Sequence, residues 1–360
     1  MLNGRHGQST SSKCSGSVLE PAEKTIDRQN GRNENSESWR EELKKAERRV
    51  DKLIQRLALP TELLPAARQA AARFPLLVPC SFLDRISRGD LQDPLLRQVL
   101  PTAAELENRE GFRADPVGDL QAVRAPGLLQ KYPGRALLVA TSCCGVHCRF
   151  CFRRAFPFSD QTVQPDRIEQ AVAVIRQDSE LQEVILSGGD PLTLPSSQLQ
   201  EMLEQLNSVS HLRRLRIHTR LPIVIPACVT ERLLKVLNSF SRRVVVVVHC
   251  NHPNELNAEC ETALRRLVQA GLVVLNQTVL LKGVNDDADT LSELCERLVD
   301  LGVLPYYLHQ LDRVSGAAHF EVPELEGKRL LQELRERLPG YCVPKYVREV
   351  PGKRYKVPLA

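Results

Sequence analysis

Apolar runs and amphipathic helical stretches alternate along the second half of the chain. The runs recur about every 30 residues after a longer first interval, which is the spacing of strand and helix units. They occupy residues 136–141, 184–186, 215–218, 244–249, 272–280 and 303–308. Between them, stretches such as 170–176, 199–206 and 260–269 place apolar residues at helical steps. The pattern therefore predicts a parallel sheet whose strands are connected by helices.

Six strand and helix units predict an α/β fold in the form of a partial, TIM-like (β/α)6 barrel. Six units are too few for a closed barrel of eight, so the predicted sheet is open. In such folds the chemistry gathers at the C-terminal ends of the strands. The polar residues that directly follow each apolar run are therefore the candidates for a functional site.

The remaining segments are predicted to be appendages of this barrel. A polar extension, a helical region, the barrel, and a C-terminal helix with a closing tail are assigned to residues 1–36, 37–130, 131–320 and 321–360. The extension has few apolar positions, which is typical of disorder. In the helical region a pattern opens at Ser38, continues to Leu57 and gives way to short helices broken by prolines. We expect this region to pack on the barrel as a lid or brace.

Composition narrows the classes of function. The formal charge is +5 from 49 basic and 44 acidic residues, and 4% of residues are aromatic, which does not favour nucleic-acid binding. No apolar run reaches membrane-spanning length, and the first residues lack a secretory signal. We therefore expect a cytoplasmic protein without a membrane partner. Eleven cysteines fit a reducing compartment and cofactor ligation better than a disulfide framework.

Three cysteines follow the first apolar run on one short loop. Cys144, Cys148 and Cys151 stand at spacings of four and three. A closed zinc site needs four protein ligands, and no second Cys-x-x-Cys pair completes one. Thiolates suit iron-sulfur clusters, and three of them leave one iron open for a non-protein ligand. The alternative is a zinc loop or three ordinary buried cysteines.

Three further candidate sites lie before the cysteine loop, just after it, and after the second apolar run at 184–186. Lys131 and Arg135 flank the turn into the first strand, where two cations either hold a phosphate or are solvated. Arg153 follows the last loop cysteine by two residues and either meets an anionic ligand or screens the loop. The segment from Ser187 to Asp190 contains two glycines. The glycines let a ligand approach the backbone, and Asp190 offers an acceptor for an ammonium group. An ordinary glycine turn without a ligand would have the same sequence.

A lysine stands between prolines near the end of the chain. Lys356 precedes Val-Pro-Leu, and Lys353 lies three residues earlier. A lysine whose pKa a pocket lowers becomes a nucleophile that traps aldehydes, whereas most tail lysines are solvated. A His/Asn/Glu cluster at 249–255 also follows an apolar run. We expect this cluster to form hydrogen bonds rather than to bind a metal.

Together these motifs resemble the lysine 2,3-aminomutase family of radical S-adenosylmethionine enzymes. The similarity runs from about Pro79 to Ala360 in one order. It is strongest to the short branch that makes β-lysine for modifying elongation factor P. The shared motifs are the three-cysteine loop, SGGDPL, RLRIHTRLPIVIP, NHPNE, NQTVLLKGVND, LPYYLHQLDRVSGAAHF and the lysine before Val-Pro-Leu.

The resemblance implies a 4Fe-4S cluster and S-adenosylmethionine as cofactors. The three loop cysteines would hold the cluster, and its open iron would bind S-adenosylmethionine. By the same similarity Phe150 borders that site. The residues that would line the methionyl amino group are Ser187, Gly188, Gly189 and Asp190.

The resemblance also implies pyridoxal 5′-phosphate and a lysine substrate. Lys356 occupies the position of the family's pyridoxal lysine, and Lys131 and Arg135 match its phosphate-contacting pair. Arg153 matches the arginine that meets the substrate carboxylate. The acids implied for the substrate's ε-ammonium are Asp286 and Glu349.

Three departures accompany this match. Glu349 stands where the family has an aspartate, so its longer carboxylate must reach the substrate differently. The glycine-rich run before the lysine is reduced to Pro351 and Gly352, and the cysteine tail that binds zinc in the long enzymes is absent. The last two favour the short branch.

The implied reaction converts L-α-lysine to β-lysine. A 5′-deoxyadenosyl radical removes and returns a hydrogen of the β-carbon while pyridoxal phosphate carries the migrating amino group. The implied partners are an electron donor such as flavodoxin or ferredoxin, and elongation factor P with its lysyl ligase through a functional link. Two alternatives stay open. One is an aminomutase of another amino acid or pathway, and the other is a non-catalytic iron-sulfur or zinc-binding protein.

Overall fold

The computed structural model describes residues 38–360 except 163–164, and these residues fall in one compact unit. The extension predicted to be disordered, 1–36, lies outside the described residues. The subdivision of the remainder at 130 and 320 stays a prediction. In the part of the chain that is described, no helix is long and apolar enough to cross a membrane.

A single ten-stranded sheet, with its strands in sequence order, forms the centre of the structure. Seven strands, β3 to β9, run parallel, whereas β1 and β2 at one end and β10 at the other pair antiparallel. The strands are β1 (Val123–Ala125), β2 (Leu128–Tyr132), β3 (Arg135–Thr141), β4 (Glu183–Gly188), β5 (Arg214–Thr219), β6 (Arg243–His249), β7 (Val273–Val279), β8 (Leu304–His309), β9 (Lys345–Arg348) and β10 (Val357–Pro358). The six predicted runs correspond to β3 to β8, so the predicted open α/β barrel is confirmed.

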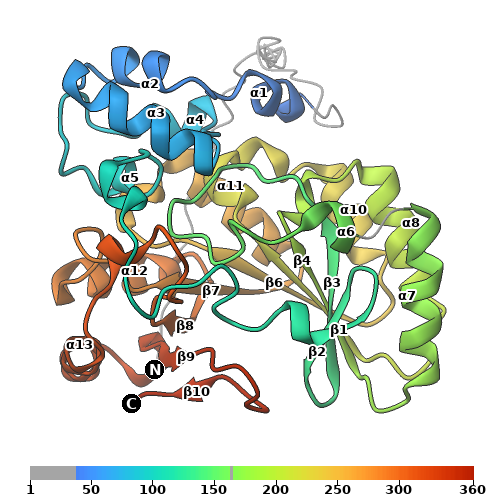
Figure 1. The fold of residues 1–360 in the computed structure, drawn as a ribbon. Helices are drawn as coiled ribbons and strands as arrows, with labels where there is room; N and C mark the ends of the chain where they lie inside the picture. The colour runs from blue at the N-terminus through green and yellow to red at the C-terminus, as the bar shows by residue number, and fades with distance from the viewer. Residues whose placement is uncertain (1–37, 163–164) are drawn as a thin grey trace, which may run out of the picture. The chain divides into compact units, whose positions relative to one another are not determined.

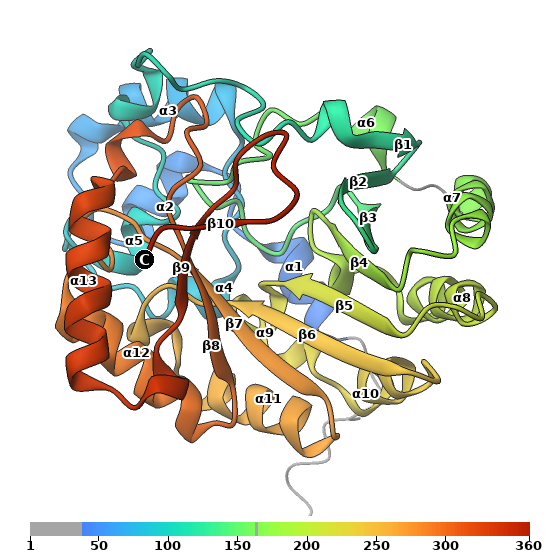
Figure 2. The ribbon, with the colours of Figure 1, turned by 90° about the horizontal axis from the view of Figure 1, so that it is seen from below.

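Helices after each of the strands β3 to β8 cover the outer face of this sheet (Figure 2). They are α6 (Phe158–Gln161), α7 (Pro165–Gln177), α8 (Ser196–Asn207), α9 (Leu221–Val224), α10 (Glu231–Asn238), α11 (Ala258–Gln269), α12 (Ala288–Asp300) and α13 (Glu324–Arg337). Side chains cap several of them, which fixes where they begin. Thr230, Asn257 and Asp287 each accept a hydrogen bond from a backbone N–H in the first turn of α10, α11 and α12.

The N-terminal helices lie together on one side of the barrel (Figure 1). They are α1 (Trp39–Lys45), α2 (Val50–Arg56), α3 (Leu64–Arg73), α4 (Cys80–Leu83) and α5 (Pro94–Arg97). Phe82 and Leu53 are fully buried and share one apolar cluster with Ile217 and Val246 of the barrel. The region therefore packs on the barrel through a common core, as the apolar pattern predicts.

The helical pattern predicted from Ser38 to Leu57 is interrupted. α1 and α2 are separate helices because Glu47, between them, pairs through its backbone with Val78 at 2.8 and 3.0 Å. Tertiary pairing thus overrides a sequence pattern that favours one helix. Short 3-10 turns complete the fold: η1 (Thr61–Leu63), η2 (Ala103–Leu106), η3 (Leu120–Ala122), η4 (Pro191–Thr193), η5 (Pro226–Cys228), η6 (Pro253–Glu255), η7 (Ala318–Phe320) and η8 (Gly340–Cys342).

Candidate active site

A cavity of about 630 Å³ lies inside the barrel at the C-terminal ends of its strands. That volume is typical of a small-molecule site. Of the predicted site residues, Cys144, Cys148, Cys151, Lys131, Arg135, Phe150, Arg153, Ser187, Gly188, Gly189, Asp190, Glu349 and Lys356 line it. Asp286 lies outside this lining, and its Oδ1 instead accepts a hydrogen bond from the N–H of Gly283 at 2.8 Å. The fold thus brings together residues that are far apart in the sequence.

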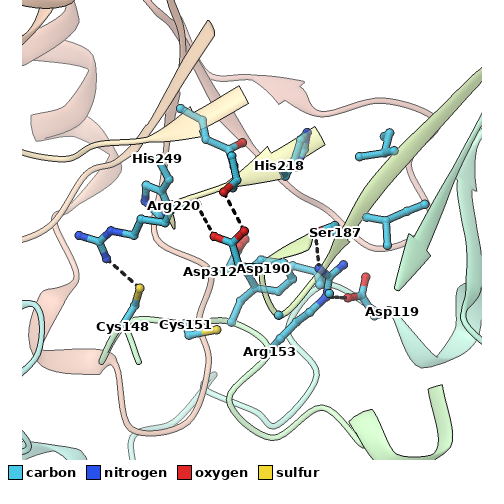
Figure 3. Close-up of a pocket in the computed structure, with 18 of the residues that line it drawn as sticks. Asp119, Cys148, Cys151, Arg153, Ser187, Asp190, His218, Arg220, His249 and Asp312 are labelled. Atoms are coloured by element: carbon cyan, nitrogen blue, oxygen red, sulfur yellow. Dashed lines mark hydrogen bonds and ion pairs between the residues drawn. The ribbon is translucent and has the colours of Figure 1, made fainter. Parts of the chain in front are cut away.

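The three-cysteine loop begins where β3 ends, and its thiols face this space (Figure 3). Burial raises the pKa of Cys151 to about 11 and raises the pKa of Cys144 well above its ordinary value. Among the described residues, no three side chains of Cys, His, Asp or Glu are grouped to hold a single metal ion. Cys148 differs from its neighbours in having a cationic partner, since Arg220 Nη1 lies 2.7 Å from its Sγ.

Glu105, which lies in η2, anchors the second half of the cysteine loop and the turn that follows it. Arg149 donates to it through Nε at 2.9 Å and Nη2 at 2.6 Å, and Arg154 donates through Nη2 at 2.6 Å. Glu105 and Arg149 are buried, so one carboxylate is the shared counter-charge of two guanidinium groups away from water. Sequence analysis did not identify Glu105. Its one local signal is a capping box with Thr102.

Replacing Glu105 by glutamine is expected to lower the free energy of unfolding by about 3–5 kcal/mol, because two buried guanidinium groups lose their counter-charge. Urea denaturation followed by circular dichroism measures the loss. Glu107→Gln is the matched control, since Glu107 is exposed and two residues away. Equal stability of the two variants would show that the buried triad does not hold the loop.

The glycine pair after β4 lets the backbone of the cysteine loop pack directly against it. A Cβ on Gly189 would lie 2.1 Å from the carbonyl oxygen of Cys143, and Gly188 has a φ of +120°. Side chains are thus excluded at both positions by the chain itself. The pair sets the distance between β4 and the cysteine loop.

The carboxylate of Asp190 is hydrogen-bonded to the loop after β5. It accepts from Thr219 Oγ1 at 2.7 Å, from the N–H of Arg220 at 2.7 Å and from the N–H of Leu221 at 2.9 Å. The N–H of Leu192 adds a fourth donor at 3.1 Å. Asp190 therefore fixes the position of Arg220, and the predicted contact of Asp190 with a ligand ammonium remains a prediction.

Asp119 joins two of the predicted cationic residues. Its carboxylate pairs with Lys131 at 2.6 Å and with Arg153 Nε at 2.7 Å. Arg153 Nη1 also donates to Ser187 Oγ at 3.1 Å, and Figure 3 draws the contacts of Arg153 with Asp119 and Ser187. Asp119 was missed from the sequence, because nothing in its local pattern marks it. It holds Arg153 in one orientation at the cavity wall.

The C-terminal tail contributes Glu349 and Lys356 to the same cavity. Glu349 pairs with Lys356 Nζ, and also with Lys131 Nζ at 3.4 Å. Burial alone raises the pKa of Glu349, but the ion pairs with the two lysines outweigh it and leave that pKa below its ordinary value. Lys353, by contrast, is exposed. The tail thus bridges from β9 to β2, across the open side of the sheet.

Arg135 is a cation of the cavity without an acidic partner among the described residues. Its guanidinium stacks on the Tyr132 ring at 4.5 Å, and the salt bridges found in residues 38–360 do not include it. A stacked arginine retains its hydrogen-bond donors for an anion. Arg135 is therefore available for an anionic ligand group.

Three histidines of the cavity wall stay neutral near pH 7. Burial lowers the pKa of His249 to about 3, and it lowers the pKa values of His218 and His309 well below the ordinary value. The Nε2 atom of His218 is buried and has no hydrogen-bond partner in the described chain. His309, the last residue of β8, lies in the LPYYLHQLDRVSGAAHF motif but was not assigned a role from the sequence.

Asp312, also missed from the sequence, lines the cavity after β8. Burial raises its pKa from 3.8 to about 7, against the opposing effect of Lys356. Its ionised form is thus disfavoured in the folded chain. The contribution of Asp312 to stability is neutral below about pH 4, becomes increasingly destabilising as the pH rises from 4 to about 7, and stays at its full destabilising value above that.

Replacing Asp312 by asparagine is therefore expected to stabilise the cofactor-free chain at pH 8 relative to pH 5. The expected gain is about 1–2 kcal/mol, with allowance for the partial exposure of the side chain. Urea unfolding at the two pH values measures it, with Asp300→Asn at an exposed position as control. A gain of the same size at both pH values would contradict the raised pKa.

Comparison with known proteins places this geometry in a family. The Radical SAM superfamily profile matches residues 138–295. An L-lysine 2,3-aminomutase of Escherichia coli is 43% identical over 324 residues, which cover 90% of this chain and 94% of that protein. The chain belongs to the lysine 2,3-aminomutase family. The family resemblance found in the sequence is thereby confirmed.

Other family members and one solved structure extend the comparison. An L-lysine 2,3-aminomutase of Clostridium subterminale is 34% identical over 89% of this chain and 77% of that protein. A radical SAM methyltransferase structure from Sphaerobacter thermophilus is 20% identical, with a TM-score of 0.44 over 61% of this chain and 68% of that one.

Membership of this family makes the protein an enzyme of the isomerase class and implies a 4Fe-4S cluster with S-adenosylmethionine. The donor set of the cavity fits both groups. Three thiols line one wall, and the family's cluster needs three protein ligands. The glycine pair beside them lines the same cavity and lets the backbone of the cysteine loop pack closely against β4.

Proposed function

We propose that this protein is a radical S-adenosylmethionine, pyridoxal phosphate-dependent L-lysine 2,3-aminomutase that converts L-α-lysine to β-lysine. The observation that carries the proposal is the lining of one cavity by the three loop cysteines, Lys356 and Arg153. Two distant parts of the chain, the loop after β3 and the C-terminal tail, thus meet at one reaction space. An aminomutase of this type needs both of its cofactors there.

The cluster cysteines and the segment from Ser187 to Asp190 are proposed to hold the cluster and S-adenosylmethionine. Phe150, packed edge-on against His249 and Phe320, gives this side an apolar wall. When bound, the cofactors supply a hydrogen-abstracting radical and a carrier for the migrating amino group. The chain's own task is to position the substrate and to exclude water.

Lys356, Lys131 and Arg135 are proposed to hold pyridoxal phosphate. Lys356 Nζ is kept inside the cavity by Glu349, which prevents it from extending into solvent. Arg135 offers donors that no carboxylate of the described chain occupies, and Lys131 lies four residues before it. Two cations at one wall are suited to a phosphate dianion.

Arg153 and Glu349 are proposed to recognise the two ends of the substrate. Arg153, whose guanidinium is oriented by Asp119, is proposed to bind the α-carboxylate. Glu349 is the acid of the predicted pair that faces the cavity, and it is proposed to receive the ε-ammonium. Asp286 is proposed as the second acid, although here it stabilises its own turn through the N–H of Gly283.

The proposed setting is the cytoplasm, with flavodoxin or ferredoxin as electron donor and elongation factor P with its lysyl ligase as the route that uses β-lysine. The ten cysteines of the described chain are free thiols, which is consistent with a reducing compartment. The extent of the match to the Escherichia coli relative, 94% of its length, supports the short branch.

An anaerobic assay tests the proposal. The reconstituted chain is incubated with reductant, S-adenosylmethionine, pyridoxal phosphate and isotopically labelled L-lysine, and α- and β-lysine are separated by chromatography and mass. Label in β-lysine is the expected result. Bound cluster and pyridoxal without β-lysine would contradict lysine as substrate, and one zinc per chain in place of iron and sulfide would contradict the enzyme itself.

A further inference from the structure

The guanidinium of Arg220 lies against the sulfur of a cluster cysteine. Its Nη1 is 2.7 Å from Cys148 Sγ, as Figure 3 shows. Arg220 directly follows β5, and its backbone N–H is fixed by Asp190. The side chain is 7% exposed. Because an arginine stays protonated, a full positive charge is held beside this sulfur away from water.

Two buried side chains orient the other end of this guanidinium. Nη2 donates to Gln98 Oε1 at 2.6 Å and to Glu255 Oε2 at 2.9 Å. Gln98 and Glu255 are fully buried, and Gln98 Nε2 donates to Glu255 Oε1 at 3.1 Å. The backbone N–H of Asn251 adds a donor to Glu255 at 2.9 Å. The network therefore directs Nη1 to Cys148 and Nη2 to the carboxylate.

Stability does not account for this arrangement by itself. The Nε atom of Arg220 is buried and has no hydrogen-bond partner in the described chain, and buried ion pairs are weak sources of stability. In residues 38–360, Cys148 is also the loop cysteine whose sulfur accepts a hydrogen bond from an arginine side chain. The geometry thus singles out one sulfur of the three.

We propose that Arg220 raises the reduction potential of the cluster by donating a charge-assisted hydrogen bond to the Cys148 thiolate, with Glu255 and Gln98 as positioning residues. The inference rests on the proposed function, which supplies the cluster. Reduction adds a negative charge to the cluster, and a fixed cation at one of its sulfurs stabilises that charge. Burial strengthens the effect because few water molecules screen it.

An EPR-monitored redox titration of the anaerobically reconstituted full chain, without S-adenosylmethionine, tests the inference. Arg220→Gln removes the positive charge. Arg220→Lys keeps the charge but lacks the two guanidinium nitrogens that reach Cys148 and Glu255 separately. At a fixed solution potential we expect at least a tenfold lower ratio of reduced to oxidised cluster in Arg220→Gln. For a one-electron couple this equals about 59 mV. Arg220→Lys should show a smaller decrease.

Arg216→Gln is the matched control. Arg216 also lines the cavity from β5, but it pairs with Glu183 at 2.8 Å rather than with a sulfur. We expect it to change the ratio by less than threefold. A decrease as large as that of Arg220→Gln would assign the effect to cavity charge in general and overturn the inference.

The remaining outcomes separate the inference from the proposed function. Unchanged potentials in both Arg220 variants overturn the inference alone, as does a decrease that appears only after S-adenosylmethionine is added. If Arg220→Gln fails to hold a cluster, the same redox titration of Glu255→Gln tests the inference. That change removes the compensating carboxylate while Gln98 still holds Arg220, so the ratio should rise at least threefold, and no rise overturns the inference. Absence of iron and sulfide from the unmodified chain contradicts the proposed function instead.

Discussion

Alanine in place of Lys356 is expected to abolish pyridoxal phosphate binding and to lower β-lysine formation by more than about a thousandfold. The amine that would bind the cofactor covalently is lost, and Lys353, the other lysine nearby in the sequence, is exposed and does not line the cavity. Lys131 still pairs with Glu349 at 3.4 Å, so the tail should keep its place. Visible absorbance of the bound cofactor and product analysis measure the two effects.

Lys353→Ala is the matched control for this change. Lys353 lies three residues earlier on the same tail, is exposed and does not line the cavity. Borohydride reduction followed by peptide mass spectrometry should place the cofactor on Lys356 in the unmodified chain and in the Lys353 variant. A cofactor found on Lys353, or retained after loss of Lys356, would contradict the assignment of the tail lysine.

The fold was predictable where strands are buried on both faces. Such strands appear in the sequence as continuous apolar runs, and the valine run of β6 (Arg243–His249) is the clearest case. The strands outside the six apolar runs, β1, β2, β9 and β10, were not predicted. They have two to five residues each, and each forms because a neighbour supplies the pairing rather than because its own residues require it.

The candidate site was predictable only for residues that belong to motifs. The cysteine loop and the glycine pair have a recognisable spacing, whereas Asp119 has none and the spacing of Glu105 from Thr102 indicates only a helix cap. Asp119 reaches Arg153 across 34 residues, and Glu105 reaches Arg149 across 44. Partners of this kind follow from tertiary structure, and only the fold identifies them. The same reason explains why the sequence predicted Glu349 as a substrate-binding acid but not its ion pair with Lys131, which lies 218 residues away.

Serine in place of Cys148 is expected to prevent assembly of the cluster and to abolish β-lysine formation. The loop would keep two thiolates, and a hydroxyl does not replace a thiolate as a ligand to iron at neutral pH. The substitution also removes the acceptor of Arg220 Nη1, so a buried guanidinium loses one partner at the same place. Iron and sulfide analysis, with the EPR signal of the reduced chain, measures the loss.

Cys143→Ser provides the control for this second prediction, because Cys143 adjoins the loop but is exposed and does not line the cavity. It should retain iron, sulfide and activity near those of the unmodified chain. Circular dichroism should show the same folded state in both variants, since the loop is anchored independently by Glu105 through Arg149 and Arg154. Full iron content in Cys148→Ser would mean that another group ligates the cluster, and the three-cysteine assignment would then be wrong.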